Sequence, residues 1–199
     1  MRSRTPSKGR GEPVTLSKEA KGELLRIART SIDRYLRGHA GTTPPPEHAS
    51  LRDPCGVFVT LKRDGELRGC IGYPEAVMPL DLAVAEAAMA AATRDPRFPP
   101  VSEEEVASLS IDISVLSPVV AVGSVDEIII GKHGLVIREG ERSGLLLPQV
   151  AVEQNMDRDS FLSHTCVKAG LSPSAWREGA SIFVFTAEVF SDRDANAAT

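Results

Sequence analysis

Apolar and polar residues recur along the chain with two different periods, and each period predicts a different element. In residues 17–37 the apolar positions follow helical spacing, between a serine that can cap the start and a glycine that can end the helix. Residues 57–61 and 67–71 predict two strands. They flank Asp64-Gly65, a dipeptide that favours a tight hairpin turn because both positions tolerate positive φ.

The middle of the chain alternates between helix and strand signals. Three consecutive prolines exclude a helix from residues 39–54 and predict a surface loop there. The alanine-rich segment 79–93 predicts a closely packed helix, which the following Asp-Pro pair ends. Ser102 and Glu105 have the spacing of a capping box and predict a short helix, and the strict alternation in 111–116 predicts a strand.

Residues 119–150 contain only strand and turn signals, which predicts a small β subdomain. Its predicted strands are 128–130, 135–137 and 145–147. After it, residues 157–169 predict a helix. Residues 182–190 predict a final strand with apolar side chains on both faces, which is typical of a central, covered position.

Together these elements predict an α+β protein, with an antiparallel or mixed sheet, packed helices and a smaller inserted β subdomain. The predicted main domain consists of 15–117 and 153–191, the subdomain is 118–152, and 1–14 and 192–199 are predicted tails. A chain of 199 residues, 42% hydrophobic and 25% charged, has the composition of a globular protein that buries a full core.

Charge and composition exclude several function classes. A net charge of −4 and an aromatic content of only 5% argue against nucleic-acid binding, which favours basic surfaces and stacking side chains. No run of 18 apolar residues is present, so we expect no membrane span. Three widely spaced cysteines fit no disulfide framework and predict reduced thiols in the cytoplasm, and four histidines without paired spacing predict no zinc site.

The most unusual local sequence is the hexapeptide Leu67–Gly72, LRGCIG, which places a cysteine between glycines. Because side chains alternate along a strand, we expect Arg68 and Cys70 on one face. A guanidinium near a thiol favours the thiolate, the form that attacks electrophiles or binds metals. Gly69 and Gly72 would leave space for a ligand or for another backbone. The hexapeptide therefore contains the parts of a reactive cysteine site.

A purely structural interpretation of the cysteine stays open, since most free cysteines are inert packing residues. If the hairpin turn holds two residues, Cys70 pairs with Val59 and Arg68 with Leu61, which is an apolar setting.

Two further polar positions are candidates for the site. Asp95 and Arg97, in a proline-stiffened loop, could hold an anionic ligand or lock the loop by an ion pair. Asp112 lies within an apolar strand, where a carboxylate needs a partner, for which Arg68 and Arg97 are the candidates.

The second half of the chain supplies a candidate base and a candidate amide. His133, in a glycine-flanked turn, could act as a base for Cys70, as could His164 on the predicted helix. Gln149 could point its amide toward the same cleft. Cys166 shares a helical face with apolar residues, and core packing is the favoured interpretation there.

In combination these motifs resemble the AMMECR family. The resemblance covers about Ser17 to Phe190 and is carried by residues 56–61, 67–72, 95–99, 131–135, 144–150 and 166–171, followed by Trp176. It implies an α+β main domain with a smaller β lobe and a cleft containing the hexapeptide. It also implies a functional association with a Memo-like protein and a radical SAM protein.

Two functions follow as hypotheses. In the first, the chain is an enzyme component in which Cys70 forms a transient covalent or metal-bound intermediate. Arg68 or Arg97 would hold an anionic group, and Asp112 or His133 would handle protons. In the second, the chain is a non-catalytic ligand- or partner-binding module in which Cys70 merely packs. The sequence specifies no cofactor under either hypothesis.

Overall fold

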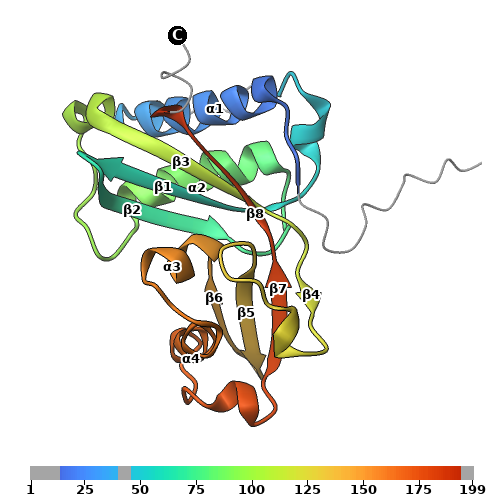
Figure 1. Ribbon diagram of the computed structural model, residues 1–199. Coiled ribbons are helices and arrows are strands. Elements are labelled where there is room, and N and C mark those ends of the chain that lie inside the picture. The colour runs from blue at the N-terminus through green and yellow to red at the C-terminus, as the bar shows by residue number, and fades with distance from the viewer. Residues whose placement is uncertain (1–13, 40–45, 194–199) are drawn as a thin grey trace, which may run out of the picture. The chain divides into compact units, whose positions relative to one another are not determined.

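The computed structural model describes residues 14–39 and 46–193, which divide into two compact units (Figure 1). The N-terminal unit comprises the chain from Thr15 to Leu116 and again from Glu188. The inserted unit comprises Ser117–Ala187. Most of the two predicted tails and part of the predicted proline loop lie outside the described residues. Helices combined with antiparallel sheets confirm the predicted α+β class.

The N-terminal unit is built on a four-stranded sheet in the order β2-β1-β3-β8. Its strands are β1 (Gly56–Arg63), β2 (Glu66–Tyr73), β3 (Leu109–Leu116) and β8 (Ala187–Ser191). Its helices are α1 (Lys18–Leu36) and α2 (Leu80–Thr93), with 3₁₀ turns η1 (Ala49–Arg52) and η2 (Glu103–Ser108). The two α-helices pack against each other, α2 against β1 and β2, and α1 against β3 (Figure 1).

Local chemistry explains why these elements form where the sequence predicts them. The Ser17 hydroxyl accepts a hydrogen bond from the Ala20 amide at 3.2 Å and so caps α1. Small side chains let α2 lie close to the sheet, and all of its alanines are buried. Leu24 of α1, Val59 of β1 and Ile113 of β3 have no exposed surface and belong to the core of this unit.

The hairpin between β1 and β2 forms as predicted, but its register differs from the prediction. Asp64 and Gly65 both have positive φ, 53° and 89°. Thr60, rather than Val59, faces Cys70, and Leu61 faces Gly69 instead of Arg68. The register shifts between Leu61 and Lys62, because β2 contains one extra residue in a β-bulge. The predicted pairing was therefore wrong by one residue.

The inserted unit has its own antiparallel sheet in the order β4-β7-β5-β6. Its strands are β4 (Val120–Ala121), β5 (Gly134–Glu139), β6 (Arg142–Leu146) and β7 (Ser181–Phe185). Its helices are α3 (Pro148–Glu153) and α4 (Arg158–Lys168), with 3₁₀ turns η3 (Val125–Glu127) and η4 (Ala175–Arg177). Helix α4 packs on β5 and β6, and its buried side chains include Phe161 and Leu162.

Three predictions for this part of the chain were wrong. Residues 128–130 form no strand, because Ile128 ends η3 and turns into the core. Helix α3 begins at Pro148, within the segment 119–150 that was predicted to contain only strands and turns. The single predicted strand 182–190 is two strands, which pair in different sheets on either side of Thr186. Only β7 lies between two other strands, as the prediction required.

The two units also divide the chain differently from the predicted domains. Residues 153–185 belong with the second sheet, since α4 packs on β5 and β6 and β7 pairs with β5. Among the described residues, no helix has both the length and the apolar character needed to cross a membrane.

Candidate functional site

Cys70 lies on β2, an edge strand, with its side chain beside Thr60 of β1. The Thr60 hydroxyl donates a hydrogen bond to the Cys70 sulfur at 3.2 Å. The Cys70 amide points away from β1, because it donates to the Asp95 carboxylate at 2.8 Å. In an antiparallel ladder, a pair whose amides point outward brings its side chains closest together. The register that the bulge creates therefore places a hydroxyl donor on the sulfur.

The two glycines of the hexapeptide have packing reasons in this fold. A Cβ atom on Gly69 would lie 2.1 Å from the carbonyl oxygen of Ala91, so glycine is needed where the α2 backbone crosses β2. A Cβ atom on Gly72 would lie 2.5 Å from the ring of Phe58. The space that the glycines leave is occupied by the protein itself at both positions.

Asp95 joins the cysteine to a guanidinium. Its carboxylate is almost fully buried, and its Oδ2 accepts both the Cys70 amide at 2.8 Å and Arg97 Nη2 at 2.7 Å. Oδ1 accepts Arg97 Nε at 3.0 Å and the Arg97 amide at 3.1 Å. The hydrogen bonds from Arg97 hold the pKa of Asp95 well below its usual range, although burial opposes the shift. The predicted alternative of an ion pair in this loop is confirmed.

The Arg97 side chain stays partly exposed while its guanidinium is held by Asp95. Its side chain is 54% exposed, and the guanidinium lies 5.5 Å from the centre of the Phe98 ring. The hydrogen bond to the Asp95 carboxylate raises the pKa of Arg97, although burial opposes the shift.

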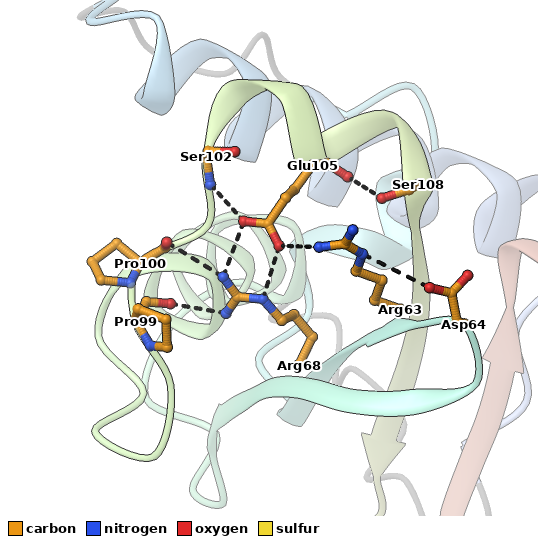
Figure 2. Close-up of polar contacts among 8 residues, drawn as sticks. All are labelled: Arg63, Asp64, Arg68, Pro99, Pro100, Ser102, Glu105 and Ser108. Carbon is orange, nitrogen blue, oxygen red and sulfur yellow. Dashed lines mark hydrogen bonds and ion pairs between the residues drawn. The ribbon is translucent and has the colours of Figure 1, made fainter.

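Arg68 is committed to a different cluster, which Figure 2 shows. Its guanidinium donates to Glu105 Oε1 at 3.2 Å and Oε2 at 3.1 Å, and to the carbonyl oxygens of Pro99 and Pro100 at 2.8 and 3.3 Å. Arg68 is the extra residue of the bulge, so the simple alternation that predicted a shared face with Cys70 is interrupted there. The Arg68 side chain is only 13% exposed and ties β2 to the loop before η2.

Glu105 is the centre of this cluster. It accepts hydrogen bonds from Arg68, from the Ser102 amide at 3.0 Å, and from Arg63 at 3.0 Å (Figure 2). The Arg68 guanidinium is the main reason why the pKa of Glu105 is lowered to about 2. The predicted capping box is thereby extended into an ion-pair network.

Asp112 lies in β3 directly opposite Thr60 of β1. Strand β1 lies between β3 and β2, so Asp112 and Cys70 flank Thr60 on its two sides. Its carboxylate is paired with Lys62 Nζ at 2.7 Å, so the predicted arginine partner was wrong. Cys70, Thr60 and Asp112 form one cross-strand row on neighbouring strands. Thr60 and Lys62 were missed by the sequence reasoning. Gly69 was the available signal for the bulge that pairs Thr60 with Cys70, since glycine within a strand often marks a bulge.

The remaining predicted residues, His133 and Gln149, belong to the inserted unit. The Nδ1 atom of His133 accepts the Ile129 amide at 3.3 Å. Burial, and secondarily the charge of Lys132, lower the pKa of His133. Gln149 is the second residue of α3. Their proposed role beside Cys70 stays a prediction.

No group of three or more His, Cys, Asp or Glu side chains within the described ranges is arranged to hold a metal ion. Cys166 has no exposed surface and packs in the core of the inserted unit, as predicted.

An α+β chain with a glycine-flanked cysteine in a hairpin strand, and with an inserted unit that has its own sheet and helices, defines a recognisable class of protein. Residues 25–190 match the AMMECR1 family model, and the chain belongs to this family. A Methanosarcina acetivorans protein is 43% identical over 189 residues, covering 88% of this chain and 94% of the relative. Protein MK0488 of Methanopyrus kandleri is 46% identical over 195 residues, covering 92% and 93%.

The fold is also present in a solved structure. The crystal structure of PH0010 from Pyrococcus horikoshii superposes with a TM-score of 0.81 at 43% sequence identity, covering 85% of this chain and 90% of that protein. None of these three relatives has a name that states an activity.

Proposed function

We propose that this chain presents Cys70 as a nucleophilic thiol to a small electrophile that carries an anionic group. The observation that carries the proposal is the shared oxygen of Asp95, which holds both the Cys70 amide and the Arg97 guanidinium. One buried carboxylate thus fixes the backbone of the nucleophile and the cation that would receive the substrate's carboxylate or phosphate.

Thr60 and Asp112 complete the proposed chemistry. The Thr60 hydroxyl donates to the sulfur, and a hydrogen bond to a charged group stabilises the charged form. In the reaction the sulfur electron pair forms a bond to an electrophilic carbon. The displaced bonding electrons depart with that carbon's leaving group or, in an addition, move from its π bond onto the atom at the other end of that bond. The thiol proton passes to solvent, and Asp112, held by Lys62, is the carboxylate of the cross-strand row.

Iodoacetate and iodoacetamide test this proposal directly, because they alkylate sulfur by the same displacement of iodide and differ in charge. The rate at Cys70, resolved from Cys55 and Cys166 by peptide mass spectrometry, should favour iodoacetate in the wild type. Arg97→Gln should reduce the iodoacetate-to-iodoacetamide rate ratio about tenfold, as expected for the loss of one ion pair partner.

Arg52→Gln provides the matched control, since Arg52 is an exposed arginine of the same unit. It should leave the rate ratio unchanged. Equal ratios in Arg97→Gln and the wild type, or no alkylation of Cys70 in the folded protein, would contradict the proposal.

A second candidate function is a non-catalytic binding module. The half-exposed side chain of Arg97, whose guanidinium is hydrogen-bonded to Asp95, favours it, because a fixed cation suits recognition of an acidic group on a partner. Under this function Cys70→Ser has no effect, whereas Arg97→Gln weakens binding. Under the first function, Cys70→Ser abolishes activity in a reconstituted system and leaves the melting temperature nearly unchanged.

The resemblance described above supplies the partners for such a system. We include in the proposal an association with a Memo-like protein and a radical SAM protein, and a location in the cytoplasm. Co-purification of both partners with the wild-type chain from a cell that contains all three tests the association. Absence of both from the purified complex would refute it.

A further inference from the structure

Phe58 places an aromatic ring on the same face of the first sheet as Cys70. Side chains two positions apart on a strand share a face, so Phe58 lies on the face of β1 that carries Thr60, the hydrogen-bond donor to the Cys70 sulfur. In the register of the hairpin, Phe58 faces Gly72 of β2, two positions from Cys70. This pair is the next one along the same face, about 7 Å from the pair that contains the sulfur.

Gly72 leaves the space that the Phe58 ring occupies. A Cβ atom on Gly72 would lie 2.5 Å from both Cγ and Cδ1 of the ring. That distance is shorter than a van der Waals contact, so a side chain at position 72 would displace the ring. The glycine therefore brings the Phe58 ring against the backbone of β2, the strand that carries the nucleophile.

The hydrophobic core of the N-terminal unit does not account for this ring. The core positions of β1 are Val57, Val59 and Leu61, which have no exposed surface. Phe58 alternates with them and therefore points to the opposite face, where it is only partly buried, as Cys70 is. A partly exposed aromatic ring beside a proposed nucleophile is a contact for an apolar part of a ligand.

Cys70 thus has a cation on one side and an aromatic ring on the other. The Cys70 amide points away from β1, and the Asp95 carboxylate that binds it holds the Arg97 guanidinium at that edge of the sheet. The Phe58 ring comes from β1, on the opposite side of β2 from this edge. An electrophilic carbon held at the sulfur therefore meets a cation in one direction and an aromatic ring in the other.

We infer that Phe58 is a specificity-determining residue, which selects electrophiles that carry a flat apolar group, such as an aryl ring, in addition to the anionic group. The inference rests on the function proposed above and narrows its substrate class to aryl-substituted carboxylates or phosphates. Two aromatic rings in offset-stacked or edge-to-face contact attract each other more strongly than their buried area alone predicts. Phe58 takes no part in the bond-making step itself.

Two thiol reagents of equal charge, 3-benzoylacrylate and 3-acetylacrylate, test the inference, because they differ only in a phenyl group against a methyl group. In both reagents the sulfur electron pair forms a bond to the alkene carbon next to the carboxylate, and the π electrons move toward the ketone, whose oxygen takes the negative charge. The resulting enolate takes up a proton from solvent, and no group leaves. The rate at Cys70, measured by peptide mass spectrometry, is divided by the rate of the same reagent with glutathione, which removes the difference in intrinsic reactivity.

The normalised rate at Cys70 should favour 3-benzoylacrylate about fivefold in the wild type. Phe58→Leu should remove this preference, whereas Phe58→Tyr should retain it, because tyrosine keeps the ring. Phe183→Leu is the matched control, since Phe183 is also partly buried and belongs to the inserted unit, and it should keep the wild-type preference. Arg97→Gln should slow both reagents equally and leave their ratio unchanged. Far-UV circular dichroism of each variant verifies that it is folded.

Two results would overturn the inference and leave the proposed function standing. The first is an equal normalised rate for both reagents at a wild-type Cys70 that still favours iodoacetate over iodoacetamide, a result that needs no variant. The second is an aryl preference that Phe58→Leu and Phe183→Leu retain alike. Absence of any labelling of Cys70 in the folded protein would instead overturn the proposed function, and the inference with it.

Discussion

Replacing Glu105 by glutamine removes the charge at the centre of the cluster in Figure 2 and leaves the side chain's shape nearly intact. The Arg68 guanidinium, assisted by the Ser102 amide and Arg63, lowers the pKa of Glu105 from 4.5 to about 2. Each unit of pKa difference between the folded and unfolded states corresponds to about 1.4 kcal/mol. The shift therefore corresponds to about 3 kcal/mol of folding free energy at neutral pH. Solvent screens little of it, since the Glu105 side chain is only 19% exposed.

The pH dependence follows from the direction of this shift. Because the folded-state pKa is depressed, the stabilisation is fully present above the unfolded-state pKa of 4.5 and is lost as the pH falls toward 2. Glu105→Gln should lower the free energy of unfolding by roughly 2–3 kcal/mol at pH 7. The difference from the wild type should shrink steadily below pH 4.5, where the wild-type carboxylate itself takes up a proton.

Urea denaturation followed by far-UV circular dichroism, repeated from neutral to acidic pH, measures both quantities. Glu104→Gln serves as the control, because Glu104 is the exposed neighbour in the same 3₁₀ turn and should change stability by less than about 0.5 kcal/mol. A Glu105→Gln penalty no larger than that of Glu104→Gln, or one that does not depend on pH, would refute the assigned role of the cluster.

Two further predictions concern packing. Gly69→Ala should destabilise the protein by at least about 3 kcal/mol, since its Cβ would lie 2.1 Å from the Ala91 carbonyl oxygen. Gly22→Ala should instead stabilise the protein by about 0.5–1 kcal/mol, because Gly22 lies within α1 and its Cβ would meet nothing within 4 Å. Thermal unfolding measures both, and an unchanged midpoint for Gly69→Ala would mean that α2 can move away. Burial raises the pKa of the Cys166 thiol, so iodoacetamide should label Cys166 only as urea unfolds the protein. Rapid labelling of Cys166 in the folded state would contradict its position in the core.

The sequence predicted those parts of the fold that depend on local chemistry. The Ser17 cap, the Asp64-Gly65 turn and the pairing of Ser102 with Glu105 are each fixed by residues within a few positions of one another. The register of the hairpin was not predictable in this way. It depends on one extra residue in β2, whose position is set by the tertiary contacts of Arg68.

The same limit applies to the candidate site. The hexapeptide and the Asp95–Arg97 pair were identified from residue types, but their partners were not. A sequence cannot say which of two arginines shares a carboxylate with the Cys70 amide when a bulge interrupts the alternation. Nor can it say that Lys62 reaches Asp112 across the sheet. Helix α3 was missed for another reason: its six residues are too few to show helical periodicity.

The chain leaves β3 and returns to β8 through neighbouring residues. The Ser117 amide donates to the Thr186 carbonyl oxygen at 2.9 Å, and the Thr186 amide donates to the Ser117 hydroxyl at 2.9 Å. Topologically, everything between these two residues occupies the place of a hairpin turn joining β3 to β8. The first sheet would keep its strand order if a short Asn-Gly turn replaced that whole segment. The segment can therefore vary in length, or be removed, without changing the order of the strands in the first sheet.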